Sequence, residues 1–305
     1  MFTRPGSGGY GPKALWNRTT AHMEPPVFFG SAALVIAFVG LGAGFTGPAA
    51  QVFESAQGWV TRTFGWWYML AATAFVVLAA VILASPARKT RLGGRGAKPA
   101  FSRLSWWSML FAAGMGTGLV FWSVAEPLTH YADPPPGFDA ATPEAAREAM
   151  RVAFFHWGLN AWGIYLILAL AVAFLHFNKD LPLAPRAILK PLFGAKVMEG
   201  PAGHVVDILC TVGTLLGVST SLGLGAMQIN VGLARFLDWP VATNIQIGLI
   251  AFITALATMS VVIGLKGGLR RLSEITLLLA AGLLIFVFIA GPTGRIMETF
   301  TASTG

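Results

Sequence analysis

The sequence predicts an all-α membrane protein with seven transmembrane helices. Of its 305 residues, 55% are hydrophobic and only 11% are charged, and the mean hydropathy is +0.67. Apolar runs recur along the chain, and a helix of about 20 apolar residues is long enough to cross a bilayer. An average soluble domain carries about 25% charged residues. This composition therefore excludes a soluble domain and indicates a polytopic membrane protein.

The seven apolar runs define the expected spans, and the basic residues define their orientation. The spans are expected at 27–45, 66–83, 105–126, 153–177, 205–236, 244–262 and 272–289. The 21 Lys and Arg residues concentrate in the N-terminal tail and in alternate loops, and the exceptions are Arg62, Arg147, Arg151, Arg235 and Arg295. Because cytoplasmic loops carry the excess of positive charge, we expect an inner (plasma) membrane protein with a cytoplasmic N-terminus.

Three further features restrict the class of protein. The net charge of +8 follows the loops and forms no basic patch interleaved with aromatics, so no nucleic-acid partner is expected. The single cysteine, Cys210, lies in an apolar run and excludes an intrachain disulfide. Residues 1–26 lack the pattern of a cleavable signal peptide and are interpreted as a cytoplasmic tail.

The first two spans are expected to be joined by a short helix on the outer surface. Residues 51–64 mix charged residues with Val, Phe and Trp, which is typical of a helix that lies in the membrane interface. The second span opens with Trp66, Trp67 and Tyr68, a pattern typical of an interfacial aromatic belt.

The third span contains the stretch on which the functional prediction depends, FAAGMGTGLVFWSVAEPLTHY at 111–131. Gly114, Gly116 and Gly118 fall within five residues. A glycine inside a helix costs about 1 kcal/mol relative to alanine, so three of them predict an interrupted helix. Secondary transporters bind substrate and coupling ions at such interruptions. The alternative is a continuous helix whose small residues pack against a neighbour.

The fourth span carries an aromatic cluster in HWGLNAWGIY, residues 156–165. On one continuous helix, Trp157, Tyr165 and Trp162 fall at about 0°, 80° and 140°, within a single arc. Trp162 and Gly116 are each expected about 13–15 Å into the bilayer, from opposite sides. Aromatic faces bind quaternary ammonium groups, and backbone carbonyls bind sodium. The alternative is that these rings belong to an outer belt or to ordinary packing.

The ionisable residues of the spans are all expected near an interface. Glu126 precedes Pro127 at the outer end of the third span, and His156 lies next to the outer surface. Asp207 and Glu274 are expected in the first turns of their spans. The sequence has no metal-ligand spacing, phosphate loop or nucleophile–base signature, so an enzyme is not expected.

The fifth span and the loop before it have simpler interpretations. Small residues recur every four positions and predict close packing of another helix, at Gly213, Gly217, Ser221 and Gly225. The hydroxyl of Thr214, beside this stripe, is expected to bond a carbonyl of its own helix. The loop 180–200 is basic and is expected to contact anionic headgroups at the cytoplasmic surface.

Three long segments, in order, resemble the betaine/carnitine/choline transporters: SWWSMLFAAGMGTGLVFWSVAEPLTHY, FFHWGLNAWGIY and DILCTVGTLLGVSTSLGLGAMQIN. The similarity runs from about Val27 to the end of the chain. It implies an inverted-repeat secondary transporter of quaternary ammonium osmolytes such as glycine betaine, choline or carnitine. The resemblance also implies ion coupling, a homotrimer in the lipid bilayer, and no cofactor other than a coupling ion such as sodium.

The resemblance also assigns roles to particular residues. Trp157, Trp162 and Tyr165 match the aromatic box of the family, and the unwound substrate-binding segment corresponds to Gly114, Met115, Gly116 and Gly118. Ala112 and Met115 would offer carbonyls to one sodium ion, and Thr214 matches a residue of another sodium site. Two positions depart from the family pattern, since Val218 replaces a second threonine and Thr117 replaces an isoleucine. These departures weaken the second sodium site and leave the substrate open.

The expected length of the family fold is greater than that of this chain. The family has about twelve spans, two peripheral helices followed by two repeats of five. On that basis the tail is 1–26, the two peripheral transmembrane helices and their basic loop are 27–104, the first repeat is 105–291, and 292–305 is an extracytoplasmic end. The chain is then expected to be a truncated N-terminal half, without active transport of its own. The alternative is a non-transporting remnant or a partner of full-length carriers.

Overall fold

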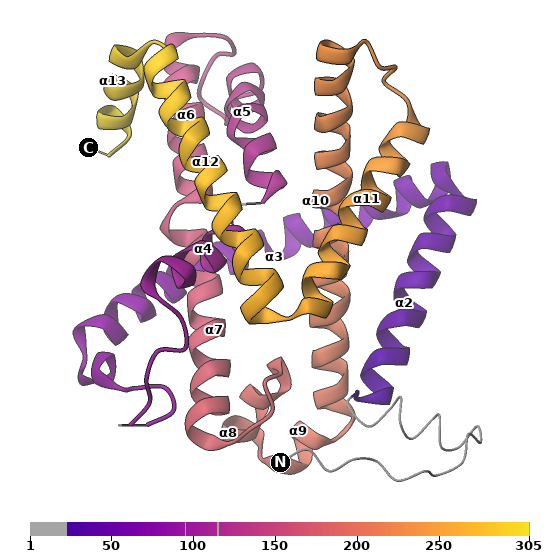
Figure 1. The fold of residues 1–305 in the computed structure, drawn as a ribbon, viewed down its shortest axis with the longest axis vertical. Helices are drawn as coiled ribbons and strands as arrows, with labels where there is room; N and C mark the ends of the chain where they lie inside the picture. The colour runs from indigo at the N-terminus through magenta and orange to yellow at the C-terminus, as the bar shows by residue number, and fades with distance from the viewer. Residues whose placement is uncertain (1–22, 95, 115, 305) are drawn as a thin grey trace. The chain divides into compact units, whose positions relative to one another are not determined.

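The protein is all-helical throughout residues 23–94, 96–114 and 116–304, which the computed structural model describes (Figure 1). The all-α prediction is therefore confirmed, while most of the predicted tail at 1–26 lies outside the described residues. The chain forms two compact units. Unit 1 comprises residues 1–94 and 165–216, and unit 2 comprises residues 95–164 and 217–305. Helices α7 and α10 pass from one unit into the other.

Six helical stretches of the described chain are long and apolar enough to cross a membrane. They are α2 (Pro25–Gly44), α3 (Thr46–Ala84), α6 with α7 (Pro143–Lys179), α10 (Pro201–Leu237), α11 (Thr243–Ile263) and the stretch Leu265–Ala290. The third predicted span, 105–126, is the one not among these six, because it consists of two shorter helices, α4 (Arg103–Gly114) and α5 (Thr117–Ala132). The interruption predicted from the glycines of this span is therefore confirmed.

In unit 1, α2 packs against α3, a continuous helix of 39 residues. The prediction of a separate surface helix at 51–64 is wrong, because this segment and the second span form one helix. Gly65 lies at their junction without breaking the helix, because one interior glycine costs only about 1 kcal/mol. The chain then turns through η1 (Pro86–Lys89), which is capped by the Ser85 hydroxyl.

The loop between α7 (Leu159–Lys179) and α10 is folded around one buried arginine. It forms η2 (Pro185–Ile188), α8 (Leu189–Phe193) and α9 (Ala195–Glu199). Arg186 Nη2 lies 2.6 Å from Glu24 Oε1, and Arg186 Nε lies 3.4 Å from Asp207 Oδ2. Asp207 also accepts a hydrogen bond from the backbone N–H of Arg186 at 2.9 Å. The loop is thus tied to the start of α2 and to α10.

Contact of the loop 180–200 with headgroups stays a prediction, but Arg186 is not available for it, since only 8% of its surface is exposed and its guanidinium pairs with carboxylates. The prediction for Asp207 is wrong. Asp207 does not lie in a first turn, because α10 begins at Pro201 and places Asp207 in its second turn. Its buried carboxylate compensates the charge of Arg186.

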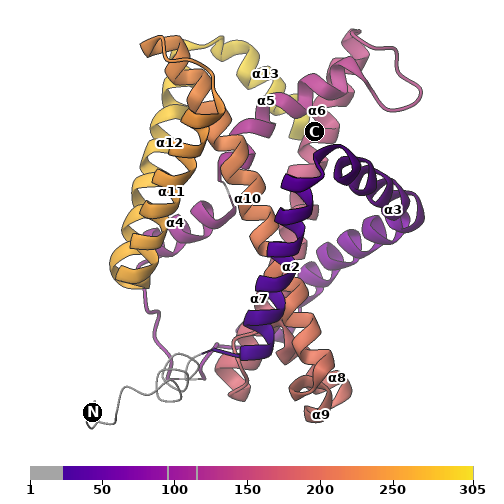
Figure 2. The same ribbon diagram turned by 90° about the vertical axis from the view of Figure 1, so that its right-hand side faces the viewer.

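In unit 2, α4 packs against α12 (Arg270–Ala290), and α11 meets α12 at the π-helical segment η3, Leu265–Leu269 (Figures 1 and 2). The Ser105 hydroxyl donates a 2.6 Å hydrogen bond to Glu274 Oε1 and joins α4 to α12. At η3 the backbone of Gly264 has φ +91, which favours glycine.

Helices α5 and α6 (Pro143–Trp157) also pack against each other in unit 2. Thr142 caps the start of α6, because its hydroxyl accepts a hydrogen bond from Ala145 N at 3.1 Å and Pro143 occupies the first turn. The polar C-terminal segment forms α13 (Thr293–Thr304), which packs against α12 and α6.

We predict that Asp207→Asn destabilises the protein by about 3–5 kcal/mol, because it leaves the Arg186 guanidinium buried with a weakened partner. The asparagine side chain can still accept from the Arg186 backbone N–H, so the substitution isolates the charge. The measurement is the unfolding midpoint in detergent micelles. Glu199→Gln, at an exposed acid nearby, serves as the control, and equal midpoints for the two variants would contradict the prediction.

Candidate binding site at the interrupted helix

The interruption of the third span creates two helix ends within that span, the C-terminal end of α4 and the N-terminal end of α5. Helix α4 ends at Gly114, and α5 begins at Thr117 with Gly116 as its N-cap, in an extended conformation at φ −87 and ψ −166. Met115 lies outside the described residues. The last four carbonyls of α4, including that of Ala112, have no N–H partner within the helix, and the same holds for the first N–H groups of α5. The α4 end therefore favours a cation, and the α5 start favours an anion.

The indole of Trp162 packs directly against the end of α4. A Cβ atom added to Gly114 would lie 2.7 Å from Trp162 Cζ3 and even closer to Cη2. Because any side chain at position 114 would occupy the space of the ring, this glycine is required for the contact. The interrupted backbone and one ring of the aromatic cluster therefore meet within unit 2.

The helix that carries the aromatic cluster is itself interrupted, whereas a continuous fourth span was expected. Helix α6 ends at Trp157 and α7 begins at Leu159, with Gly158 in a turn between them. A Cβ atom on Gly158 would lie 2.5 Å from the carbonyl oxygen of Phe154. The angles calculated for one continuous helix are therefore wrong between Trp157 and Trp162. The Trp162 Nε1–H instead donates to the carbonyl oxygen of Trp157 at 3.2 Å.

Trp157 is held by the carboxylate of Glu126. Its indole Nε1–H donates to Glu126 Oε2 at 2.6 Å, and His156 Nδ1 lies 2.9 Å from Glu126 Oε1. Glu126 was expected near an interface, but it is only 6% exposed and is bound by protein groups. Helix α5 also continues through Pro127 to Ala132, because a proline removes one helical hydrogen bond without ending a helix whose neighbours hold it. The available signal was an acid within an apolar run.

The other predicted binding residues have separate environments. Tyr165 follows Trp162 by three residues on α7, belongs to unit 1, and is 69% exposed. A Cβ atom on Gly118 would lie 3.7 Å from the hydroxyl of Ser221, an ordinary contact between α5 and α10 within unit 2. At Gly213 and Gly217 an added Cβ would meet no atom of the described chain within 4 Å, so close packing of another helix stays a prediction there.

The structure describes two of the three residues predicted to bind sodium, Ala112 and Thr214. The Thr214 hydroxyl donates to the carbonyl of Cys210 at 2.8 Å, as expected for a threonine inside a helix. Ala112 offers a carbonyl at the end of α4, and the carbonyl of Met115 lies outside the described residues. Among the residues that the structure describes, no group of three or more His, Cys, Asp or Glu side chains is placed to hold a metal ion.

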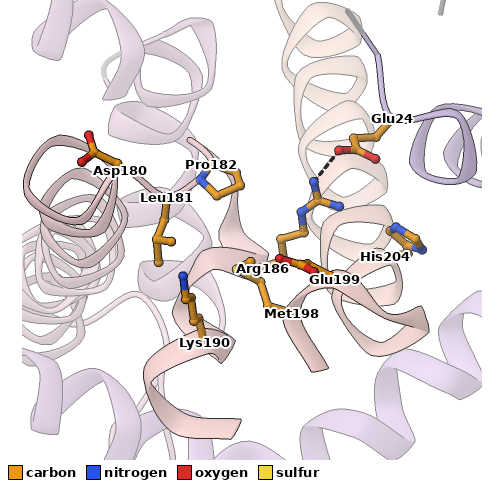
Figure 3. Close-up of a pocket in the computed structure, with 9 residues that line it drawn as sticks. All are labelled: Glu24, Asp180, Leu181, Pro182, Arg186, Lys190, Met198, Glu199 and His204. Atoms are coloured by element: carbon orange, nitrogen blue, oxygen red, sulfur yellow. Dashed lines mark hydrogen bonds and ion pairs between the residues drawn. The ribbon is translucent and has the colours of Figure 1, made fainter. Parts of the chain in front are cut away.

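A separate pocket of about 500 Å³ lies in unit 1 beside the Arg186 ion pairs (Figure 3). The lining residues are Glu24, Asp180, Leu181, Pro182, Arg186, Lys190, Met198, Glu199 and His204. Figure 3 shows the Glu24 carboxylate directed at the Arg186 guanidinium, which is therefore occupied. The lining carries no Trp, Tyr or Phe ring, so this pocket does not suit a quaternary ammonium group.

An interrupted membrane helix with an aromatic ring packed at its break is the architecture of a secondary transporter. The family model for BCCT, the betaine/carnitine/choline family transporter, matches residues 26–305. The chain therefore belongs to the betaine/carnitine/choline transporter family, as its sequence motifs indicated, and membership of this family of transporters confirms that it is not an enzyme.

Curated relatives support this membership. The chain is 45% identical to the glycine betaine transporter OpuD of Bacillus subtilis over 84% of its length, which covers 50% of that relative. It is 40% identical to the high-affinity choline transport protein of Escherichia coli K12 over 95% of its length, covering 42% of that protein. The glycine betaine transporter of Acinetobacter baylyi is 39% identical over 93% of the chain and 43% of that relative. The chain thus spans about half the length of these relatives.

We predict that Gly114→Ala destabilises unit 2 by about 1–3 kcal/mol, because the new methyl group overlaps the Trp162 indole. Gly116→Ala is the matched control, since an added Cβ there meets no atom within 4 Å. Unfolding midpoints of both variants in detergent measure the difference. Replacing Trp162 by Leu should remove most of the effect of Gly114→Ala. Equal midpoints for Gly114→Ala and Gly116→Ala would show that the indole does not pack on Gly114.

Proposed function

We propose that the chain is part of a secondary transporter that takes up quaternary ammonium osmolytes, glycine betaine or choline, across the inner membrane. The observation that carries the proposal is the Trp162 indole packed on Gly114, at the break between α4 and α5. Family membership and the names of the relatives support the same substrate class.

The chemistry of the substrate fits the groups at this break. A trimethylammonium group cannot donate hydrogen bonds, so a protein recognises it with the faces of aromatic rings. Trp162 and, in this proposal, Trp157 and Tyr165 supply those faces. The carboxylate of glycine betaine would bind the free N–H groups at the start of α5, next to Gly116 and Gly118. Choline lacks this carboxylate, so the break favours glycine betaine over choline.

We further propose that sodium couples transport through a single site at the end of α4. Carbonyl oxygens suit a hard cation, and the negative end of the α4 dipole adds attraction for it. Ala112 and Met115 would supply these carbonyls. The second site predicted at Thr214 is weaker, because Val218 offers no oxygen ligand from its side chain.

The remaining proposals concern topology and assembly. A cytoplasmic N-terminus accounts for the distribution of basic residues, and a homotrimer is the assembly implied by the family resemblance. Because the relatives are about twice as long, further helices would complete the carrier. The alternative is a non-transporting membrane protein that binds intact carriers through the open face of α10 at Gly213 and Gly217.

We predict that the complete product of the gene encoding this sequence accumulates glycine betaine in a bacterial strain that lacks other betaine carriers. Trp162→Leu should reduce uptake at least tenfold, about 1.4 kcal/mol, because it removes the aromatic face, while Trp162→Phe should retain part of it. Initial rates with labelled glycine betaine and choline are the measurement.

Trp59→Leu, at an exposed tryptophan of α3, is the matched control and should leave uptake unchanged. An unaffected Trp162→Leu variant would exclude Trp162 from the site. Failure of the unmodified protein to accumulate either compound would favour the non-transporting alternative.

We predict that replacing external sodium with potassium at constant pH abolishes uptake, because the inward sodium gradient that would drive the carrier is then absent. Thr214→Ala should change the half-saturating sodium concentration by less than about twofold, since Val218 supplies no second hydroxyl to complete a site there. The measurement is uptake as a function of sodium concentration. Uptake that is indifferent to sodium and lost when the proton gradient is dissipated would refute sodium coupling.

A further inference from the structure

Glu126 is the centre of a buried polar cluster that joins α5 to α6 within unit 2. Both of its carboxylate oxygens are engaged: Oε2 accepts from the Trp157 indole at 2.6 Å, and Oε1 lies 2.9 Å from His156 Nδ1 and 3.6 Å from His130 Nε2. The carboxyl-bearing side chain is only 8% exposed, whereas His156 is 64% exposed. The indole is thus held by a carboxylate that bulk water hardly reaches.

The cluster connects to the candidate site through the backbone of Trp157. The carbonyl oxygen of this residue accepts a hydrogen bond from Trp162 Nε1 at 3.2 Å, and the Trp162 ring in turn packs on Gly114. Glu126 therefore fixes the last residue of α6 just before the turn at Gly158. The indole N–H of Trp157 thus donates to Glu126, and the indole N–H of Trp162 donates to the backbone of Trp157.

Glu126 itself lies too far from the break to touch a substrate there. It follows Gly116 by about ten residues of α5, which corresponds to about 15 Å along the helix axis. A hydrogen bond to an ionised carboxylate is about twice as strong as a neutral one, and burial strengthens it further. Such a bond acts on the N–H at the edge of the Trp157 ring and keeps the ring in one orientation, with the His156 ring beside it at a centroid distance of 5.1 Å.

We propose that Glu126 is a positioning residue for substrate recognition: its buried carboxylate holds the Trp157 indole and, through the end of α6, orients Trp162 at the break. The proposal rests on the proposed function for its effect on substrate affinity. Its structural part, the fixed position of the Trp157 indole, is independent of any substrate.

The first experiment tests the position of the indole without ligand. The near-ultraviolet circular dichroism contributed by Trp157 is the difference between the unmodified protein and Trp157→Phe, which keeps a ring but has no N–H donor. Glu126→Ala should lose this difference signal, and Glu126→Gln, which keeps one acceptor oxygen, should retain most of it. A Trp157 signal that is unchanged in Glu126→Ala would overturn the proposal.

The second experiment is a double-substitution cycle on the apparent affinity for glycine betaine, measured with the complete gene product. Glu126→Ala should weaken it about tenfold in the unmodified protein and less than about twofold in the Trp157→Phe background, because Glu126 acts through that N–H. Glu126→Gln should cost less than Glu126→Ala, which keeps the test interpretable if the alanine variant folds poorly. His156→Gln, at the exposed partner, should stay within about twofold.

The outcomes of this cycle are distinct. Equal losses in both backgrounds, or lower stability with unchanged affinity, would show that Glu126 has only a structural role. If the unmodified protein binds no quaternary ammonium compound, the proposed function fails, and the spectroscopic experiment alone decides whether Glu126 positions Trp157.

Discussion

The contact between the Trp162 indole and the α-carbon of Gly114 is the constraint on which the candidate site depends. It requires a glycine at the end of α4, because a methyl group there would overlap the ring. It also requires Gly158, whose turn lets α7 start anew and brings Trp162 Nε1 to the Trp157 carbonyl. In a membrane, free helix ends are tolerated only beside protein or a cavity. An aromatic ring at such an end therefore creates a place where a methylated ammonium group and a carboxylate of the same molecule can both be bound.

Three acids of this protein, of which Glu126 and Asp207 are buried, share one structural role. Glu126 joins α5 to α6, Glu274 joins α12 to α4 through Ser105, and Asp207 joins α10 to the loop that carries Arg186. Burying a carboxylate is costly unless hydrogen bonds or an opposite charge compensate it. Each acid is compensated by a partner from another segment, so the cost of burial is lowered only when the two segments are correctly placed. In an apolar protein with little hydrophobic driving force between helices, such contacts specify which helices meet.

The sequence supported the fold class, the interrupted third span and the family, because apolar runs and clustered glycines are local signals. The errors concern residues whose structure depends on distant partners. Glu126 was expected near an interface because His156 and Trp157, its partners, lie on another helix. Asp207 was expected in a first turn because α10 begins at Pro201, before the apolar run that marked the span. Gly158 was treated as an ordinary helical residue, although it lies in a turn where a Cβ atom would clash with the carbonyl oxygen of Phe154. Gly65, by contrast, lies inside α3 and does not interrupt it.

The central claim is that aromatic faces at the interrupted helix recognise the positive charge of a methylated ammonium group. The most direct measurement compares glycine betaine with 3,3-dimethylbutanoate, its carbon isostere, as competitors for binding to the purified complete protein. The two compounds share shape and carboxylate and differ only in the charge at the quaternary centre. Recognition through cation–π interaction predicts that the isostere binds at least about tenfold more weakly. Equal affinity of the two compounds would contradict the account.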